Sequence, residues 1–154
     1  MLRLKAAASA VEDFTSGTFR PVIPETVADI DPAGVRRVLL CSGKVYYDLL
    51  AERAKRAGSG GGQVAIVRVE QLAPLPAREI AEAVSAYGDA QLVWVQEEPA
   101  NQGGWPFMAL NLPAALGGRA LSCVARPASA SPAAGSHKVH DQEQHALVEQ
   151  AFTL

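Results

Sequence analysis

The sequence has few of the residues that mark a disulfide-bonded or metal-binding protein. Only two cysteines occur among its 154 residues, Cys41 and Cys123, and they have neither metal-ligand spacing nor the number that a disulfide framework needs. Both lie in apolar runs, where free cysteines commonly pack as small hydrophobic side chains. We therefore expect a protein of the reducing cytoplasm.

Strong charge and long apolar runs are also missing. The formal net charge is −2 and no extended basic cluster occurs, so we do not expect a nucleic-acid partner. Apolar runs such as residues 38–41 and 91–95 are far shorter than the roughly 20 residues that cross a bilayer, and we expect no membrane span. The basic, alanine-rich start lacks the apolar core of a secretory signal, so export is not indicated.

The residues that are present predict one globular domain preceded by a linker. Hydrophobic residues make up 49% of the chain, enough for a packed core in a domain of this length. Residues 1–35 have no sustained hydrophobic period, and Gly17, Pro21 and Pro24 interrupt them. We interpret residues 1–35 as a linker or approach segment and residues 36–154 as the domain.

Short apolar runs alternate with amphipathic stretches through the predicted domain. The runs at 36–41, 64–69, 92–95 and 121–124 predict strands. The intervening stretches predict helices over 44–57, 77–87, a looser one carrying residues 107–112, and 142–152, with Gly58 ending the first. This alternation predicts a three-layer α/β domain, a mostly parallel sheet flanked by helices, and leaves room for one antiparallel strand at an edge.

A candidate anion site follows the first predicted strand. Ser42, Gly43 and Lys44 form a turn that opens a helix, where free backbone N–H groups and the helix dipole favour a phosphate. The alternative is a plain turn, because no flanking glycine pattern surrounds it. The glycine-rich residues 58–62 follow a helix rather than a strand, so we interpret them as a flexible connector.

A second candidate cluster follows the third predicted strand, at the sheet edge where open α/β domains bind ligands. It consists of Glu97, Glu98, Asn101, Gln102 and Trp105. Paired acids can transfer protons, but the side chains of adjacent residues usually point in different directions. We therefore predict an interface or support role for the cluster.

Three histidines and two serines are of types that can bind a metal or act as a nucleophile. His137, His140 and His145 lack a His-Glu-x-x-His arrangement, and the step from 140 to 145 does not align on one helix face, so we predict no metal site. Ser129 and Ser131 lack the Gly-x-Ser-x-Gly elbow of a nucleophile. We predict no catalytic, cofactor-binding or metal-binding residue in this chain.

Four segments carry specific sequence signatures: residues 41–50 (CSGKVYYDLL), 64–72 (VAIVRVEQL), 94–103 (WVQEEPANQG) and 126–133 (RPASASPA). In this order they resemble the C-terminal region of the decarboxylating component of 2-oxoglutarate dehydrogenase. The approach segment 17–21 (GTFRP) is also similar, so the resemblance covers almost the whole chain. His140 matches a histidine of the family pattern, whereas His137 and the glycine-rich connector depart from it.

The resemblance implies a transketolase C-terminal-like domain that supports a homodimeric enzyme. The family decarboxylates 2-oxoglutarate on thiamine diphosphate, in the tricarboxylic acid cycle, and passes the succinyl group to a lipoyl-bearing succinyltransferase. Thiamine diphosphate, magnesium and the catalytic histidines belong to preceding domains, so the resemblance implies that this chain alone is inactive. Two alternatives stay open: a regulatory module that binds a nucleotide or acyl-CoA, and a separately encoded docking subunit.

Overall fold

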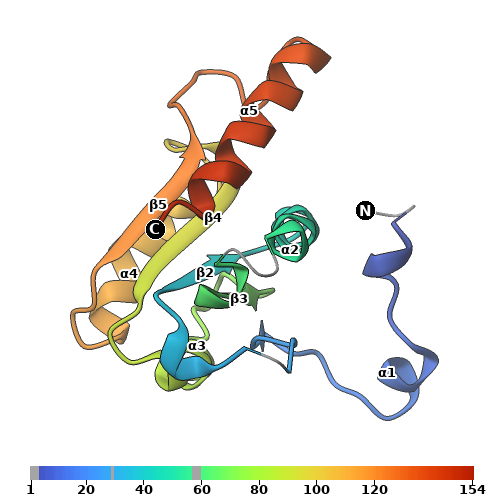
Figure 1. Cartoon of the computed structure of the whole chain (residues 1–154), viewed down its shortest axis with the longest axis vertical. Helices are drawn as coiled ribbons and strands as arrows, with labels where there is room; N and C mark the ends of the chain where they lie inside the picture. Colours follow the sequence, from blue (N-terminus) through green and yellow to red (C-terminus); the bar gives the residue numbers. More distant parts are fainter. Residues whose placement is uncertain (1–3, 29, 57–59) are drawn as a thin grey trace.

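A five-stranded sheet forms the centre of the molecule (Figure 1). The computed structural model describes residues 4–28, 30–56 and 60–154. The strand order is β1-β3-β2-β4-β5, in which β1 is antiparallel to β3 and the other neighbours are parallel. The strands are β1 (Val22–Ile23), β2 (Arg37–Cys41), β3 (Val64–Val69), β4 (Gln91–Pro99) and β5 (Leu121–Arg126).

Helices cover both faces of the sheet. On one face lie α2 (Val45–Lys55) and α5 (His137–Ala151), and on the other lie α3 (Ala77–Val84) and α4 (Trp105–Ala115). Because successive strand residues point to opposite faces, Leu39 packs in one core and Val38 and Leu40 pack in the other. The predicted three-layer α/β fold, similar to the transketolase C-terminal domain, is confirmed.

The central strand, β2, is covered on both edges and on both faces. All five residues of β2 are buried, since parallel neighbours flank it on both edges and helices cover both its faces. Its one charged residue, Arg37, donates hydrogen bonds to Oε1 of Gln91 at 2.8 and 3.0 Å and to the carbonyl of Ala151 at 2.9 Å. The guanidinium thus ties the amino edge of the sheet to the end of α5.

Part of the segment before residue 36 packs on the sheet. Strand β1, which the sequence pattern did not predict, pairs with β3 and is the antiparallel edge strand for which the pattern left room. Just after it, the buried carboxylate of Glu25 binds the guanidinium of Arg53 and accepts a 2.8 Å hydrogen bond from the amide of Ile66. Residues 4–20 lie apart from the sheet (Figure 1). The domain boundary at residue 36 stays a prediction.

Strand β4 and helix α5 have bounds that differ from those that the sequence predicts. Strand β4 continues to Pro99, which pairs with Arg126 beyond an irregularity in register, so Glu97 and Glu98 lie within the strand rather than after it. Helix α5 begins at His137 instead of residue 142, because its first two turns are polar and only its later half packs on the sheet. The predicted helix stop at Gly58 lies outside the described residues.

The short remaining elements are α1 (Val11–Thr15) and 3-10 turns at Lys5–Ala7, Pro32–Gly34, Gly61–Gln63 and Ser85–Tyr87. In the described ranges no helix is both long enough and apolar enough to cross a membrane.

Candidate functional site at the carboxyl edge of the sheet

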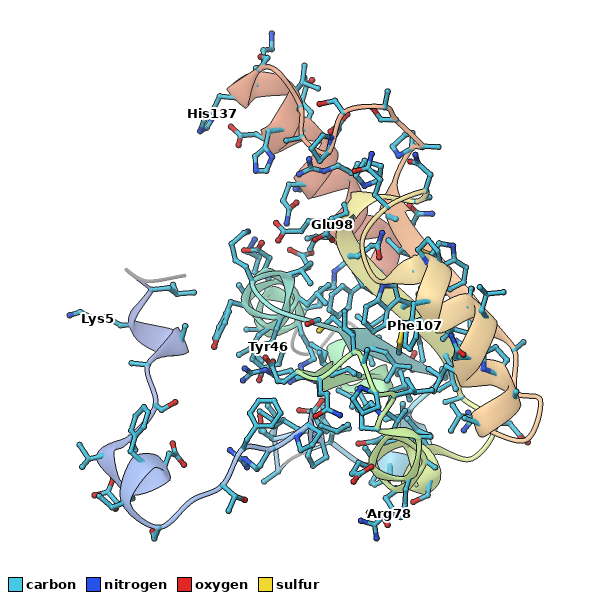
Figure 2. The ribbon with its side chains drawn as sticks, turned by 180° about the vertical axis from the view of Figure 1, so that it is seen from behind. Lys5, Tyr46, Arg78, Glu98, Phe107 and His137 are labelled. Carbon is cyan, nitrogen blue, oxygen red and sulfur yellow. The ribbon has the colours of Figure 1, made fainter. Side chains whose placement is uncertain are left out.

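The two clusters predicted from the sequence meet at one edge of the sheet. The chain leaves β2 toward α2 on one face of the sheet and leaves the neighbouring β4 toward α4 on the other face, which creates a crevice at the carboxyl ends of β2 and β4. A cavity of about 230 Å³ lies there, lined by Ser42, Gly43 and Lys44 from the turn after β2 and by Glu97 and Glu98 from the end of β4. Figure 2 labels Glu98 at this edge.

Lys44 is engaged by carboxylates of its own chain. Its Nζ lies 2.8 Å from Oδ2 of Asp48 and 2.9 Å from Oε1 of Glu97. Burial lowers the pKa of Lys44, but the hydrogen bonds to these two carboxylates outweigh burial and raise it. An anion that enters the cavity must therefore compete with two negative charges for this ammonium group.

Gly43 shapes the turn that carries Lys44. Its φ of +73° lies in the left-handed region, which residues with a Cβ adopt only with strain. The turn lets α2 begin at Val45 directly after the sheet, with the cavity beside it. Ser42 and Gly43 therefore lie where the sequence predicts, at a strand-to-helix turn.

Glu97 and Glu98 do not form an acid pair. Glu97 is directed to Lys44, as the ion pair shows, whereas Glu98 is exposed to solvent. The Glu97 carboxylate is thus engaged by an ammonium group of its own chain, and Glu98 does not share that partner. General acid–base chemistry by this pair has no geometric support.

Gln96 organises the site, although the sequence analysis did not single it out. This buried side chain accepts hydrogen bonds at Oε1 from the indole N–H of Trp94, at 2.9 Å, and from the backbone N–H of Trp105, at 2.8 Å. Its Nε2 donates to the carbonyl oxygens of Gln102 (2.8 Å), Pro99 (3.1 Å) and Glu98 (3.3 Å). The sequence feature that could have predicted this role is a glutamine within an apolar strand, between two tryptophans.

Asn101 and Gln102 hold a distant loop of the same chain. Asn101 Nδ2 donates to the carbonyl of Ser129 at 3.0 Å, and the Ser129 amide donates back to Asn101 Oδ1 at 3.0 Å. Gln102 Nε2 donates to the same carbonyl at 2.8 Å. These residues therefore support the loop after β5, and Trp105 begins α4 at the edge of the core.

Helix α4 is apolar on its outer side as well as on its inner side. Met108 and Leu112 are completely buried against the sheet, whereas Leu110 is 81% exposed and Phe107 is 36% exposed. Figure 2 labels Phe107 on this helix. A surface helix normally carries polar residues on its solvent side, and an all-round apolar helix is typical of a buried one.

Two of the histidines contact neighbouring side chains of the same chain. His140 Nδ1 lies 2.9 Å from Arg126 Nη2, and His137 pairs with Asp141. Within the part of the chain that the structure describes, no group of three or more His, Cys, Asp or Glu side chains could hold a metal ion. Both cysteines are free, and burial raises the pKa of Cys41 to about 12 and that of Cys123 to about 11.

Comparison with known proteins gives the family. Residues 8–152 match the family model described as 2-oxoglutarate dehydrogenase C-terminal. The chain is 46% identical to the multifunctional 2-oxoglutarate metabolism enzyme of Mycolicibacterium vanbaalenii over 99% of this chain and 12% of that protein. It is 43% identical to the 2-oxoglutarate dehydrogenase E1 component of Azotobacter vinelandii over 100% of this chain and 16% of that protein.

The chain therefore spans less than a fifth of the length of these relatives. The match extends from the segment before the sheet to the end of α5, and thus includes the crevice, Gln96 and α4. On this match and the observed fold, the chain belongs to the 2-oxoglutarate dehydrogenase C-terminal family.

Proposed function

We propose that this chain is the structural and dimerisation domain of a 2-oxoglutarate dehydrogenase, without catalysis of its own. In this proposal the rest of the enzyme decarboxylates 2-oxoglutarate and transfers the succinyl group to a lipoyl-bearing succinyltransferase, in the tricarboxylic acid cycle. The names of the relatives and the small share of their length that is matched support it. The two free cysteines favour the cytoplasm as its compartment.

Thiamine diphosphate and magnesium do not fit the described residues. Magnesium takes oxygen ligands from carboxylates and phosphates, yet the acids of the crevice are either exposed or bound to Lys44. The diphosphate would meet one lysine whose charge two carboxylates already balance. We therefore assign both cofactors to other domains of the enzyme, where they would supply the decarboxylation chemistry.

The main support for the structural role is the exposed apolar face of α4. Leu110 is 81% exposed in the middle of an apolar helix, and that helix begins at Trp105, the last residue of the predicted support cluster. Burying one leucine side chain in an interface contributes about 2 kcal/mol. An exposed apolar helix face of this kind suits contact with the second subunit.

The test replaces Leu110 with aspartate in an enzyme polypeptide that carries this chain. We expect L110D to weaken the dimer at least about tenfold, measured by sedimentation velocity, because a buried unpaired carboxylate costs more than the lost apolar contact. Trp105→Ala should also weaken the dimer. Val139→Asp is the matched control, since Val139 is exposed on α5, on the opposite face of the sheet. An unchanged dimer in L110D would refute the proposal.

The absence of catalysis has its own test. Purified chain is titrated with thiamine diphosphate and magnesium by calorimetry, and 2-oxoglutarate decarboxylation is followed with an artificial electron acceptor. Neither binding nor turnover is expected. Robust turnover by the chain alone would overturn the assignment of the cofactors to other domains.

A regulatory module is the second candidate, and the crevice favours it. The cavity of about 230 Å³ lies at the switch point of the sheet, beside Ser42, Gly43 and Lys44, where α/β domains bind ligands. Calorimetric titration with adenine nucleotides and acyl-CoA, on the wild type and on Lys44→Met, tests it. Absence of heat at millimolar ligand removes the idea.

A third candidate is a docking subunit that is encoded separately. It differs from the structural domain and the regulatory module because it would bind the catalytic domains without a covalent link. Mixing the purified chain with the catalytic domains, produced as another polypeptide, decides between them. Formation of a stable, active complex supports docking, whereas no association by size-exclusion chromatography contradicts it.

A further inference from the structure

A second, smaller cavity lies at the carboxyl end of β5. It has a volume of about 60 Å³ and is lined by Arg126, Ser129, Ser131 and Glu143, among others. The chain leaves β5 there through the loop of residues 127–135, which leads to the start of α5 (Figure 1). Neither the crevice at β2 and β4 nor the outer face of α4 includes this cavity.

The guanidinium of Arg126 is buried and incompletely bonded. The residue is 6% exposed, and its Nη2 lies 2.9 Å from His140 Nδ1 and 3.4 Å from Gln144 Oε1. Its Nε is buried without a hydrogen-bond partner. The nearest carboxylate oxygen, Oε2 of Glu143, is 3.7 Å away, which is too far for a hydrogen bond.

A buried charged donor without an acceptor is rare in folded proteins, because the lost hydration is not replaced. The cavity beside Arg126 thus lacks one acceptor atom. Ser129 lies in the same cavity, and its Oγ accepts a 3.1 Å hydrogen bond from the Ser131 amide, which leaves the hydroxyl proton available to a second acceptor.

We propose that Arg126 and Ser129 bind a carboxylate group of a small-molecule ligand. One carboxylate supplies the acceptor that Glu143, at 3.7 Å, does not supply to the guanidinium, and it is small enough for the cavity. A phosphate dianion brings a second negative charge next to Glu143 and is therefore the poorer ligand. Asn101 and Gln102 fix the loop backbone at Ser129, so the site is ordered before the ligand binds.

Acetate is the probe, and the Nε–H resonance of Arg126 is the readout. In ¹H–¹⁵N spectra of the purified chain we expect this resonance to shift saturably with acetate at constant ionic strength, and to shift less with inorganic phosphate at equal concentration. Arg126→Gln should abolish saturable binding, measured by the amide resonances of the loop. No saturable shift of Nε–H, as for a site that holds water alone, overturns the proposal, as does a larger response to phosphate.

A charge-neutralising variant keeps the proposal testable if Arg126→Gln does not fold. Glu143→Gln removes the carboxylate that competes for the guanidinium, and acetate should bind roughly two- to fivefold more tightly, the range of a partly exposed ion pair. Glu149→Gln makes the same charge change at an exposed position of α5 and should leave acetate affinity unchanged. Equal affinities in these two variants would contradict a site at Arg126.

Discussion

Replacing Gln96 with methionine removes the centre of the carboxyl-edge network at nearly constant volume. Two of the five hydrogen bonds of this side chain are completely buried, those with the indole N–H of Trp94 and with the carbonyl of Pro99. Each buried polar group that loses its partner costs about 1–3 kcal/mol. The expected loss in the free energy of unfolding is therefore about 2–6 kcal/mol, a large part of the stability of a typical domain.

Urea denaturation of the purified chain, followed by tryptophan fluorescence, measures this loss. Gln71→Met is the matched control, because its side chain makes one exposed hydrogen bond, to the carbonyl of Pro74 at 2.8 Å. That control should lose less than about 1 kcal/mol. If the two variants lose equal amounts, Gln96 does not organise the site and the reasoning from its hydrogen bonds is wrong.

Three further predictions concern buried groups. Burial alone would raise the pKa of Glu25, but hydrogen bonds from its arginine partner and from backbone amides lower it. Its contribution to stability is thus complete above the unfolded-state pKa and is lost as pH falls through the folded-state pKa. Glu25→Gln should cost about 3 kcal/mol at pH 7, and urea titrations should show this difference shrinking in acid. Since complete burial raises the pKa of Cys41 to about 12, Ellman's reagent at pH 8 should label this thiol only on unfolding, and its rapid labelling in the native chain contradicts this. Gly104→Ala places a Cβ 2.9 Å from the Trp94 ring and should lower stability by about 1–3 kcal/mol in thermal melts, whereas an unchanged melting temperature would mean that the ring yields freely.

The sheet and its four parallel strands could be predicted because their signal is local. Residues 64–69 are apolar almost without interruption, the pattern of a strand covered on both faces, and the structure buries five of these six residues. Strand β1 has two residues between prolines, and only its pairing with β3, over forty positions away, makes it a strand. No periodicity within residues 1–35 contains that information.

The site was predictable in position but not in its contacts. Strand ends and turn residues located Ser42 to Lys44 and the cluster from Glu97 to Trp105 at one edge, and of that cluster the structure brings Glu97 and Glu98 to the crevice beside Ser42 to Lys44. Asn101 and Gln102 instead contact the loop at Ser129. The ion pair between Lys44 and Glu97 and the hydrogen bonds between Asn101 and Ser129 join residues far apart in the chain. Such contacts depend on loop conformations that residue types alone do not specify.

The attachment of Glu25 to Arg53 and to the amide of Ile66 has a mechanical consequence. Polypeptide that approaches the sheet through residue 20 is anchored at β1 and again at Glu25, on two different elements of the domain. A force on the segment before residue 20 therefore reaches β3 through β1 and reaches α2 through the ion pair of Glu25. Residues 22–25 therefore move with the sheet and with α2 rather than as a free linker.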